Sequence, residues 1–366
     1  MDFQPGIMTS CVHSDRPIHV KLLTKGKHED DGENRYHAFP GGKPVWGNCH
    51  FHFHRDFRDY DWLVVNEDLP CMGRELYEEI LACPRAHTLF STNEPSSIKV
   101  YGHRFMQQFG RILTSQEPWV VRHSGHVYRQ PGLNWHYGRG DGRGYYDNLT
   151  TNVPHNKSKV ISTVTSNKQQ RHTLHHQRYR FVQRLKQLYP ELDFFGRGIR
   201  PIEVKADALD SYKYHLAIEN YFGDHHWTEK LSDSFLGACM PIYYGCPNAE
   251  EYFPPESFIR IDIKNPEAAA EIIRKAVVDQ TYEKNLPAIL ESRRLVLQEY
   301  GPYSEIVRII NRYHNPTLMP AAKPERIANR YLIRRGLRGV LEHVSESAYV
   351  SLRHKLARSH SRPASA

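Results

Sequence analysis

The second half of the chain alternates strand-like and helix-like patterns in the order that builds a parallel sheet. Residues 159–165 (KVISTVT) form a β-branched run, 175–189 carry apolar residues at helical intervals, and 192–195 (LDFF) form a second apolar run. A similar order of strand, helix and strand recurs over 214–244. Because a strand, a crossover helix and a second strand make one βαβ unit, this half predicts an α/β domain with a parallel sheet.

The first half of the chain also alternates short apolar runs with turn residues, which favours a second α/β domain. A helix is expected near 73–82. The strand-like runs lie at 18–23, 61–65, 87–91 and 111–114.

The composition between these halves divides the chain. Residues 138–158 have the Gly, Asp, Asn and Pro content of a linker, and this places a boundary near residue 150. Helices are expected at 267–278 and 283–312, after which several prolines interrupt the chain. The expected parts are an N-terminal α/β domain (1–150), a C-terminal α/β domain (151–315) and a helical basic tail (316–366).

The positive charge of the chain is concentrated in that tail. The net charge is +8, and residues 323–366 hold ten Lys and Arg against three Glu. The first 322 residues are therefore almost neutral. A protein that binds nucleic acid would be expected to carry its basic surface on the folded domain that contacts the polymer, so no nucleic-acid partner is expected.

The tail itself has an amphipathic pattern. The basic residues Arg330, Arg334 and Arg338 predict a stripe along one helix, beside apolar residues at helical spacing. Two interpretations stay open: a solvated terminal helix, or an interfacial helix that lies on an anionic membrane surface through residues 323–358. The apolar residues are Ile333, Leu337, Val340, Leu341 and Val344.

The segment 212–245 carries the best candidate site. A buried strand is expected to end at Glu219-Asn220, and ligands of α/β sheets bind beyond the carboxyl ends of strands. The next helix is expected to begin near Thr228, and the free backbone N–H groups of its first turn would suit a diphosphate. Lys230 opposes the helix dipole in the first turn, so an anionic ligand would explain it, and Glu229 could accept hydrogen bonds from ribose. The alternative is an ordinary capped surface helix.

The same segment resembles a known family. Glu219-Asn220, then Glu229-Lys230, then PIYYG at 241–245 and ESFIRID at 256–262 resemble the donor-binding pattern of glycosyltransferase family 10, the α-1,3/4-fucosyltransferases. This resemblance implies two Rossmann-like domains that face a cleft, known as the GT-B arrangement. It also implies GDP-fucose as the donor substrate, inversion at the anomeric carbon, and no obligatory metal or other cofactor.

The resemblance also implies roles for single residues. Glu94, in Glu94-Pro-Ser-Ser, is similar to the proposed general base of the family, and Arg178 is similar to an Arg that contacts the diphosphate. His226 stands where the family has Tyr; a His there could donate to phosphate, with a pH-sensitive charge. The residues implied for donor binding are Ser166, Asn167, Arg178, Asn220, His226, Glu229 and Lys230.

Two other patterns could bind a metal. His50, His52 and His54 alternate with Phe51 and Phe53, which indicates either a zinc-binding face or an aromatic core face backed by polar His. The second interpretation is favoured because no complete ligand set lies nearby, and no metal site is predicted. An Asp-Tyr-Asp sequence at 59–61 precedes its strand, where ligands do not gather.

The six cysteines include no Cys-x-x-Cys pair, which indicates reduced thiols in a cytoplasmic protein, peripheral on the inner membrane if the tail binds lipid. The resemblance to family 10 predicts an inverting, metal-independent fucosyltransferase that acts on a hydroxyl of a glycan. The expected product is an α-1,3 linkage on a surface polysaccharide or lipid-linked oligosaccharide. The alternatives are a transferase for another GDP-sugar and a non-catalytic nucleotide- or glycan-binding protein.

Overall fold

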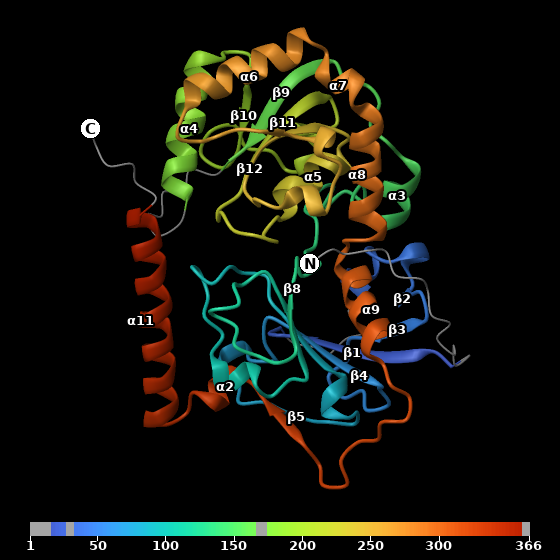
Figure 1. Cartoon of the computed structure of the whole chain (residues 1–366). Coiled ribbons are helices and arrows are strands. Elements are labelled where there is room, and N and C mark those ends of the chain that lie inside the picture. The colour runs from blue at the N-terminus through green and yellow to red at the C-terminus, as the bar shows by residue number, and fades with distance from the viewer. Residues whose placement is uncertain (1–15, 27–32, 166–173, 361–366) are drawn as a thin grey trace.

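The computed structural model describes residues 16–26, 33–165 and 174–360, which form two domains around two separate sheets (Figure 1). The sheet of the first domain has the order β2-β3-β1-β4-β6-β7-β8, and only the β2–β3 pair is antiparallel. Its strands are β1 (Ile18–Thr24), β2 (Val45–Trp46), β3 (Cys49–His52), β4 (Trp62–Asn66), β6 (Thr88–Ser91), β7 (Arg111–Thr114) and β8 (His126–Tyr128).

The sheet of the second domain is parallel throughout, in the order β10-β9-β11-β12-β13. Its strands are β9 (Lys159–Val164), β10 (Asp193–Phe195), β11 (Tyr212–Ile218), β12 (Met240–Tyr244) and β13 (Ile259–Arg260). The four strand runs expected in the first half, and those expected around 159–244, are confirmed within a few residues. The predicted α/β fold class is confirmed as well.

Helices flank the second sheet: α4 packs on α6, and α5 packs on α8 (Figure 1). The expected helix over 283–312 is three helices, because prolines in the first turns of α8 and α9 start new ones. The helices are α1 (Glu33–Tyr36), α2 (His103–Met106), α3 (Tyr146–Thr151), α4 (His175–Leu188), α5 (Glu229–Leu236), α6 (Pro266–Val278), α7 (Thr281–Lys284), α8 (Leu286–Gln298), α9 (Pro302–Tyr313), α10 (Arg330–Ile333) and α11 (Leu337–His360).

The helix predicted near 73–82 is wrong. This segment contains a short 3-10 turn at Met72–Arg74 and the strand β5 (Glu78–Ile80). The strand β14 (Arg326–Ala328) pairs with β5 antiparallel, with Ile327 opposite Glu79. A partner so distant along the chain leaves no local pattern, and pairing with it overrides the local helical preference.

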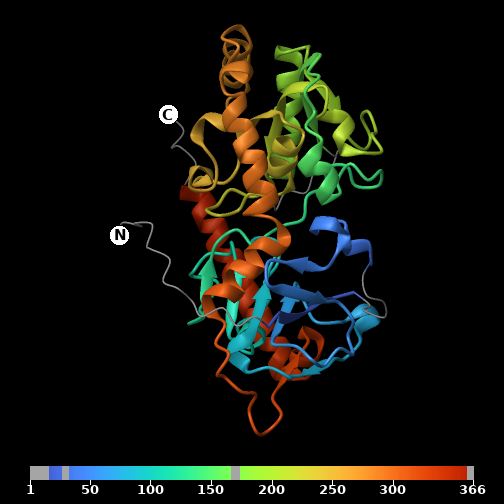
Figure 2. The same cartoon turned by 90° about the vertical axis from the view of Figure 1, so that its right-hand side faces the viewer.

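The chain returns to the first domain before the boundary expected at residue 315. Figure 2 shows α8 and α9 running along one side of the molecule from the second domain to the first. In α9 the ring of Tyr303 stacks on Phe39 with centroids 3.8 Å apart, and Glu305 pairs with Arg129 at 3.1 Å. The first domain is therefore built from both ends of the described chain.

The tail is not the single helix with a basic stripe that the sequence predicts. Gly336, with φ of 87°, separates α10 from α11. Arg330 pairs with the buried Asp68 at 2.7 Å, and Arg334 donates to the carbonyls of Val100 and Tyr101. These two cations are bound to the first domain instead of forming a free charged face.

One long face of α11 is apolar and points away from the protein. Leu337 is 78 % exposed, and Leu341, Val344, Leu352 and Leu356 follow it at helical intervals, all exposed. None of the helices in the described part of the chain combines the length and the apolar content needed to cross a bilayer.

The burial of β14 gives a test of this arrangement. Ile327 is fully buried among side chains of the first domain, so Ile327→Ala should lower the free energy of unfolding by about 2–5 kcal/mol. Leu337→Ala, at an exposed position in the same tail, should change it by less than about 0.5 kcal/mol. Urea unfolding of both variants measures the difference, and equal stabilities would contradict a tail that is part of the first domain.

Candidate active site

A cavity of about 1120 Å³ lies between the two domains and is lined by residues of both. Leu22, Asn66 and Ser91 line it from the carboxyl ends of β1, β4 and β6, and Glu219 and Asn220 line it from the end of β11. This is the position at which ligands bind in open parallel sheets. Its volume exceeds that of most small-molecule sites and suffices for a nucleotide joined to a sugar.

On the second-domain wall, the carboxylate of Glu219 fixes the start of α5. Glu219 is fully buried and accepts hydrogen bonds from the backbone N–H of Thr228 at 2.8 Å and from its hydroxyl at 2.6 Å. Thr228 is the N-cap residue, as predicted, and its hydroxyl also accepts from the N–H of Lys230. The end of β11 and the first turn of α5 are therefore locked together, with the helix N-terminus at the cavity.

Lys230 lies among carboxylates in this first turn. Its Nζ is 2.7 Å from Glu229 Oε1 and 3.5 Å from Glu219 Oε2. Burial disfavours the charged form of Lys230, but Glu229 and Glu219 outweigh this effect and raise the pKa of Lys230. Burial likewise disfavours the charged form of Glu229, but Lys230 and Lys205 lower the pKa of Glu229. The two carboxylates account for a cation at this position without a ligand, which corrects the argument that an anionic ligand is needed to explain it.

Arg178 lies behind the wall. Its Nη1 donates to the side-chain oxygen of Asn220 at 2.6 Å, and its Nε is buried without a partner among the described residues. Burial lowers the pKa of Arg178, while Glu219 and Glu229 oppose that shift. Arg178 and Lys230 are close enough to act on each other electrostatically. However, only Asn220 of the hydrogen-bonded pair lines the cavity, so Arg178 reaches it through that side chain.

His226 lines the cavity and is buried. Its Nδ1 is 3.0 Å from the hydroxyl of Ser115, which follows β7 in the first domain. Burial, together with Lys230, lowers the pKa of His226 to about 3. With these neighbours the ring is neutral at physiological pH, and donation to a phosphate at this position stays a prediction.

On the first-domain wall, Glu94 faces the cavity from the loop after β6. Burial and the neighbouring Glu67 raise the pKa of Glu94, while Lys99 and Lys230 oppose the shift. Glu67, with φ of 71°, accepts from the backbone N–H of Asn93 at 2.7 Å and binds Lys99 and Tyr101. A strained residue therefore anchors the loop that carries Glu94.

The structure brings together Glu94, Asn220, His226, Glu229 and Lys230, as the sequence predicts. Ser166 and Asn167 lie outside the described residues. Sequence reasoning missed the loop 131–140, which lines the cavity. Only its last residues, 138–140, overlap the segment expected to be a linker, and the loop is tied to α5 by the N–H of His136, 2.9 Å from Asp233 Oδ1. Sequence reasoning named Glu219 at the end of a strand but missed its contact with Thr228, nine residues later along the chain.

No three His, Cys, Asp or Glu side chains lie together in a metal-binding cluster within 16–26, 33–165 and 174–360. The rings of Phe51 in β3 and of Phe53 just after it are buried in the core, and His50 and His52 lie on the other face of the strand, as the favoured interpretation predicts. His52 Nε2 is 2.9 Å from His19 Nδ1. Asp61 accepts from the N–H of His19 ahead of β4 and lies away from the cavity lining.

Two Rossmann-like domains face each other across a cleft, with a helix N-terminus on one wall, and this is the arrangement known as GT-B. The second domain also matches a family model: residues 154–285 match "Glycosyltransferase family 10 (fucosyltransferase) C-term". The resemblance to glycosyltransferase family 10 found in the sequence is therefore confirmed over these residues.

Known proteins are similar to short stretches of the chain. The alpha-(1,3)-fucosyltransferase FucT of Helicobacter pylori is 34% identical over 92 residues, which are 23% of this chain and 19% of that enzyme. A human 4-galactosyl-N-acetylglucosaminide 3-alpha-L-fucosyltransferase is 32% identical over 104 residues, 27% of this chain and 29% of its own. The matched stretches thus span less than a third of either relative. A crystal structure of an alpha1,3-fucosyltransferase with GDP-fucose superposes with a TM-score of 0.45 and 17% identity, covering 81% of this chain and 96% of that one.

The Glu219–Thr228 contact generates a prediction. Thr228→Val keeps the shape of the side chain but removes the hydroxyl that donates to a fully buried carboxylate. The free energy of unfolding should fall by about 1–3 kcal/mol, the cost of leaving a buried group unsatisfied. Thr228→Ser, which retains the hydroxyl, is the matched control in denaturant unfolding. A valine variant as stable as the serine variant would show that the contact does not hold α5 in place.

Proposed function

We propose that this protein is an inverting, metal-independent fucosyltransferase that moves fucose from GDP-fucose to a hydroxyl of a glycan acceptor. The expected product is an α-1,3 linkage on a surface polysaccharide or a lipid-linked oligosaccharide. The observation that carries the proposal is the cavity that places Glu94 of one domain within electrostatic reach of Lys230, at the α5 N-terminus of the other. The family match of residues 154–285 supports the choice of donor.

Charged groups on the second-domain wall stabilise the negative charge that develops on the departing GDP. In fucosyl transfer the bond to the diphosphate breaks and GDP gains negative charge in the transition state. Lys230 and the positive end of the α5 dipole face this region in advance, which is the usual way in which enzymes stabilise developing charge. Arg178 holds the carboxamide of Asn220 and places its own positive charge behind that wall.

Glu94 supplies the base. As the acceptor hydroxyl attacks the anomeric carbon, the carboxylate of Glu94 takes the proton of that hydroxyl. Because burial and Glu67 raise the pKa of Glu94, the carboxylate is lost at a higher pH than for an exposed Glu. The acidic limb of kcat/KM is therefore displaced to higher pH. Glu67 is itself held by Lys99 and Tyr101, so the loop that carries the base is fixed before the acceptor arrives.

The test of the proposal is nucleotide choice followed by turnover. In a thermal-unfolding panel, GDP should stabilise the protein and UDP and CMP should not; a ligand at 100 times its dissociation constant adds about 2.7 kcal/mol. Transfer to a glycan acceptor mixture is then compared for GDP-fucose and GDP-mannose. No uptake of GDP would refute the proposal, binding without turnover would favour a non-catalytic binding protein, and preference for GDP-mannose would change the donor.

Within the same assay, Glu94→Gln separates binding from chemistry. The amide keeps the size of the side chain but cannot accept the proton, so kcat should fall by about 10²- to 10⁴-fold. Calorimetric affinity for GDP should stay within about twofold, because the contacts of the α5 wall are untouched. Near-normal transfer by this variant would remove Glu94 from the catalytic role.

We further propose that the protein is cytoplasmic and that the outward apolar face of α11 lies on the anionic surface of the inner membrane. Replacing Leu341 and Val344 by Glu, both exposed and directed away from the protein, should abolish sedimentation with phosphatidylglycerol vesicles and leave the unfolding temperature unchanged. Sedimentation that persists in this double variant would contradict the proposal. The cytoplasmic location stays a prediction.

A further inference from the structure

The carboxylate of Glu117, in the loop after β7, receives hydrogen bonds from both sides of the cleft. Ser96 Oγ donates to Glu117 Oε2 at 2.6 Å, and the hydroxyl of Tyr221 donates to Oε1. Ser96 lies two residues after Glu94, and Tyr221 directly follows Asn220. One carboxylate thus joins the loop that carries the proposed base to the loop that forms the donor wall.

The hydrogen atoms of this cluster can be assigned from the contacts. Because the single hydroxyl hydrogen of Ser96 is given to Glu117, the Nε2 of His354, 2.8 Å from Ser96 Oγ, must be a donor. The contacts then form a chain from His354 through Ser96 to Glu117, with Tyr221 as the second donor. Burial and Glu117 raise the pKa of Tyr221, so its hydroxyl stays protonated, and Ser96 is only 2 % exposed. Water competes little for these hydrogen bonds.

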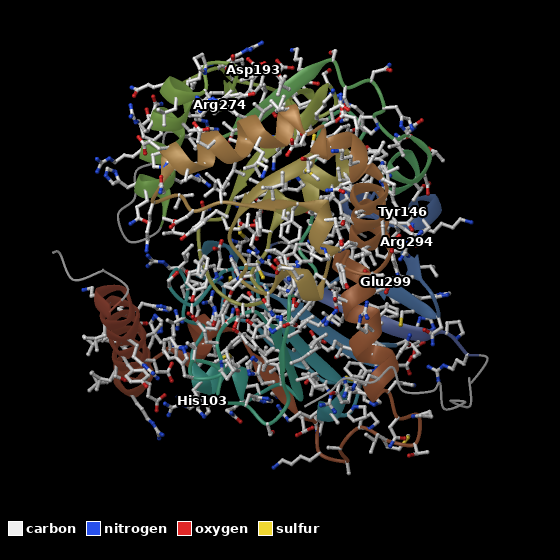
Figure 3. All side chains as sticks on the ribbon, turned by 45° about the horizontal axis from the view of Figure 1, so that its top comes forward. His103, Tyr146, Asp193, Arg274, Arg294 and Glu299 are labelled. Atoms are coloured by element: carbon white, nitrogen blue, oxygen red, sulfur yellow. The ribbon has the colours of Figure 1, made fainter. Side chains whose placement is uncertain are left out.

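His354 belongs to α11, and the rest of that helix is attached to the first domain. The His354 ring lies edge-on to Trp119, with centroids 5.3 Å apart, and edge-on to Tyr221 at 6.0 Å. Two turns earlier, the carboxylate of Glu346 accepts from the backbone N–H of His103 at 3.2 Å. Figure 3 shows His103 beside α11 at the flank of the first domain. The helix therefore runs up that flank to the loops on both sides of the cleft.

A second contact holds the donor loop to the same segment of the first domain. The hydroxyl of Ser115 meets Nδ1 of His226 at 3.0 Å, and Glu117 meets Tyr221. Residues 115–117 therefore contact both ends of the stretch 221–226. These side chains are among the contacts that fix the relative position of the two cleft walls.

We propose that His354 and Glu117 are positioning residues, through which the terminal helix α11 holds the Glu94 loop against the donor loop in the closed cleft. The inference rests on the proposed function and goes beyond it, because none of the side chains in this chain of contacts lines the cavity. The outward face of α11 is exposed, while its inward face contributes to the placement of the Glu94 loop. Loss of His354 would leave the Glu219–Thr228 contact at the start of α5 intact, but it would loosen both loops and with them the placement of Glu94.

The first experiment does not depend on turnover. Hydrogen–deuterium exchange of the full chain compares wild type with His354→Ala, read on peptides that cover residues 93–99 and 220–227. Exchange in both segments should be several-fold faster in the variant, because opening of one loop releases the other. Lys355→Ala, an exposed neighbour on the same helix, is the matched control and should match wild type. Unchanged exchange in His354→Ala would overturn the inference.

The second experiment separates positioning from a merely structural effect. His354→Ala should lower kcat about 3- to 10-fold, as expected for one lost hydrogen bond, with the KM for GDP-fucose within about twofold of wild type. Tyr221→Phe removes the other donor to Glu117, and the double variant should be less impaired than the product of the two single effects. Faster exchange with unchanged kcat, or strictly multiplicative effects, would contradict the positioning role. Calorimetry with GDP on the wild type tests the proposed function separately. Absence of GDP binding would refute the proposed function but would not change the result of the exchange experiment.

Discussion

The burial of one carboxylate organises the donor side of this protein. Glu219 ends the central strand β11 with no exposure to solvent, and such a charge is tolerated only when its oxygens are satisfied. Thr228 and Lys230 satisfy them, and both are in the first turn of α5. The requirement to pair a buried charge therefore decides where the helix begins and which of its residues face the cleft. The same pairing draws in Glu229, so that a cation and two carboxylates form one electrostatic unit.

Much of the second domain could be predicted because its information is local. Each strand of the βαβ units is a short apolar run, and each helix carries its own periodicity and cap, as Thr228 illustrates. The residues that meet at the cleft were predicted for the same reason, since the carboxyl ends of parallel strands share one edge. Glu94 is an exception, because only the resemblance to a family pointed to it.

The failures have the opposite cause, which is dependence on distant partners. The segment 78–80 becomes a strand only because 326–328 lies beside it. The basic residues of the tail gave a convincing stripe, yet Arg330 is bound to Asp68, a buried carboxylate far back in the sequence. Similarly, the neutral state of His226 follows from burial, and its Nδ1 is engaged by a serine of the other domain. No periodicity or spacing within a segment contains such information.

The path of the chain also limits how the two lobes can move. The second domain is joined to the first by two links, one after α3 and one between α8 and α9, and Arg293 of α8 donates to the carbonyl of Asn152 at 2.9 Å, so these links lie close together. In Figure 1 they lie on the side opposite α11. A domain attached at two neighbouring points rotates, as about a hinge, around the line through them. A ligand would therefore enter and leave the cleft along a single arc, and the cleft would open widest at its far edge, where α11 lies.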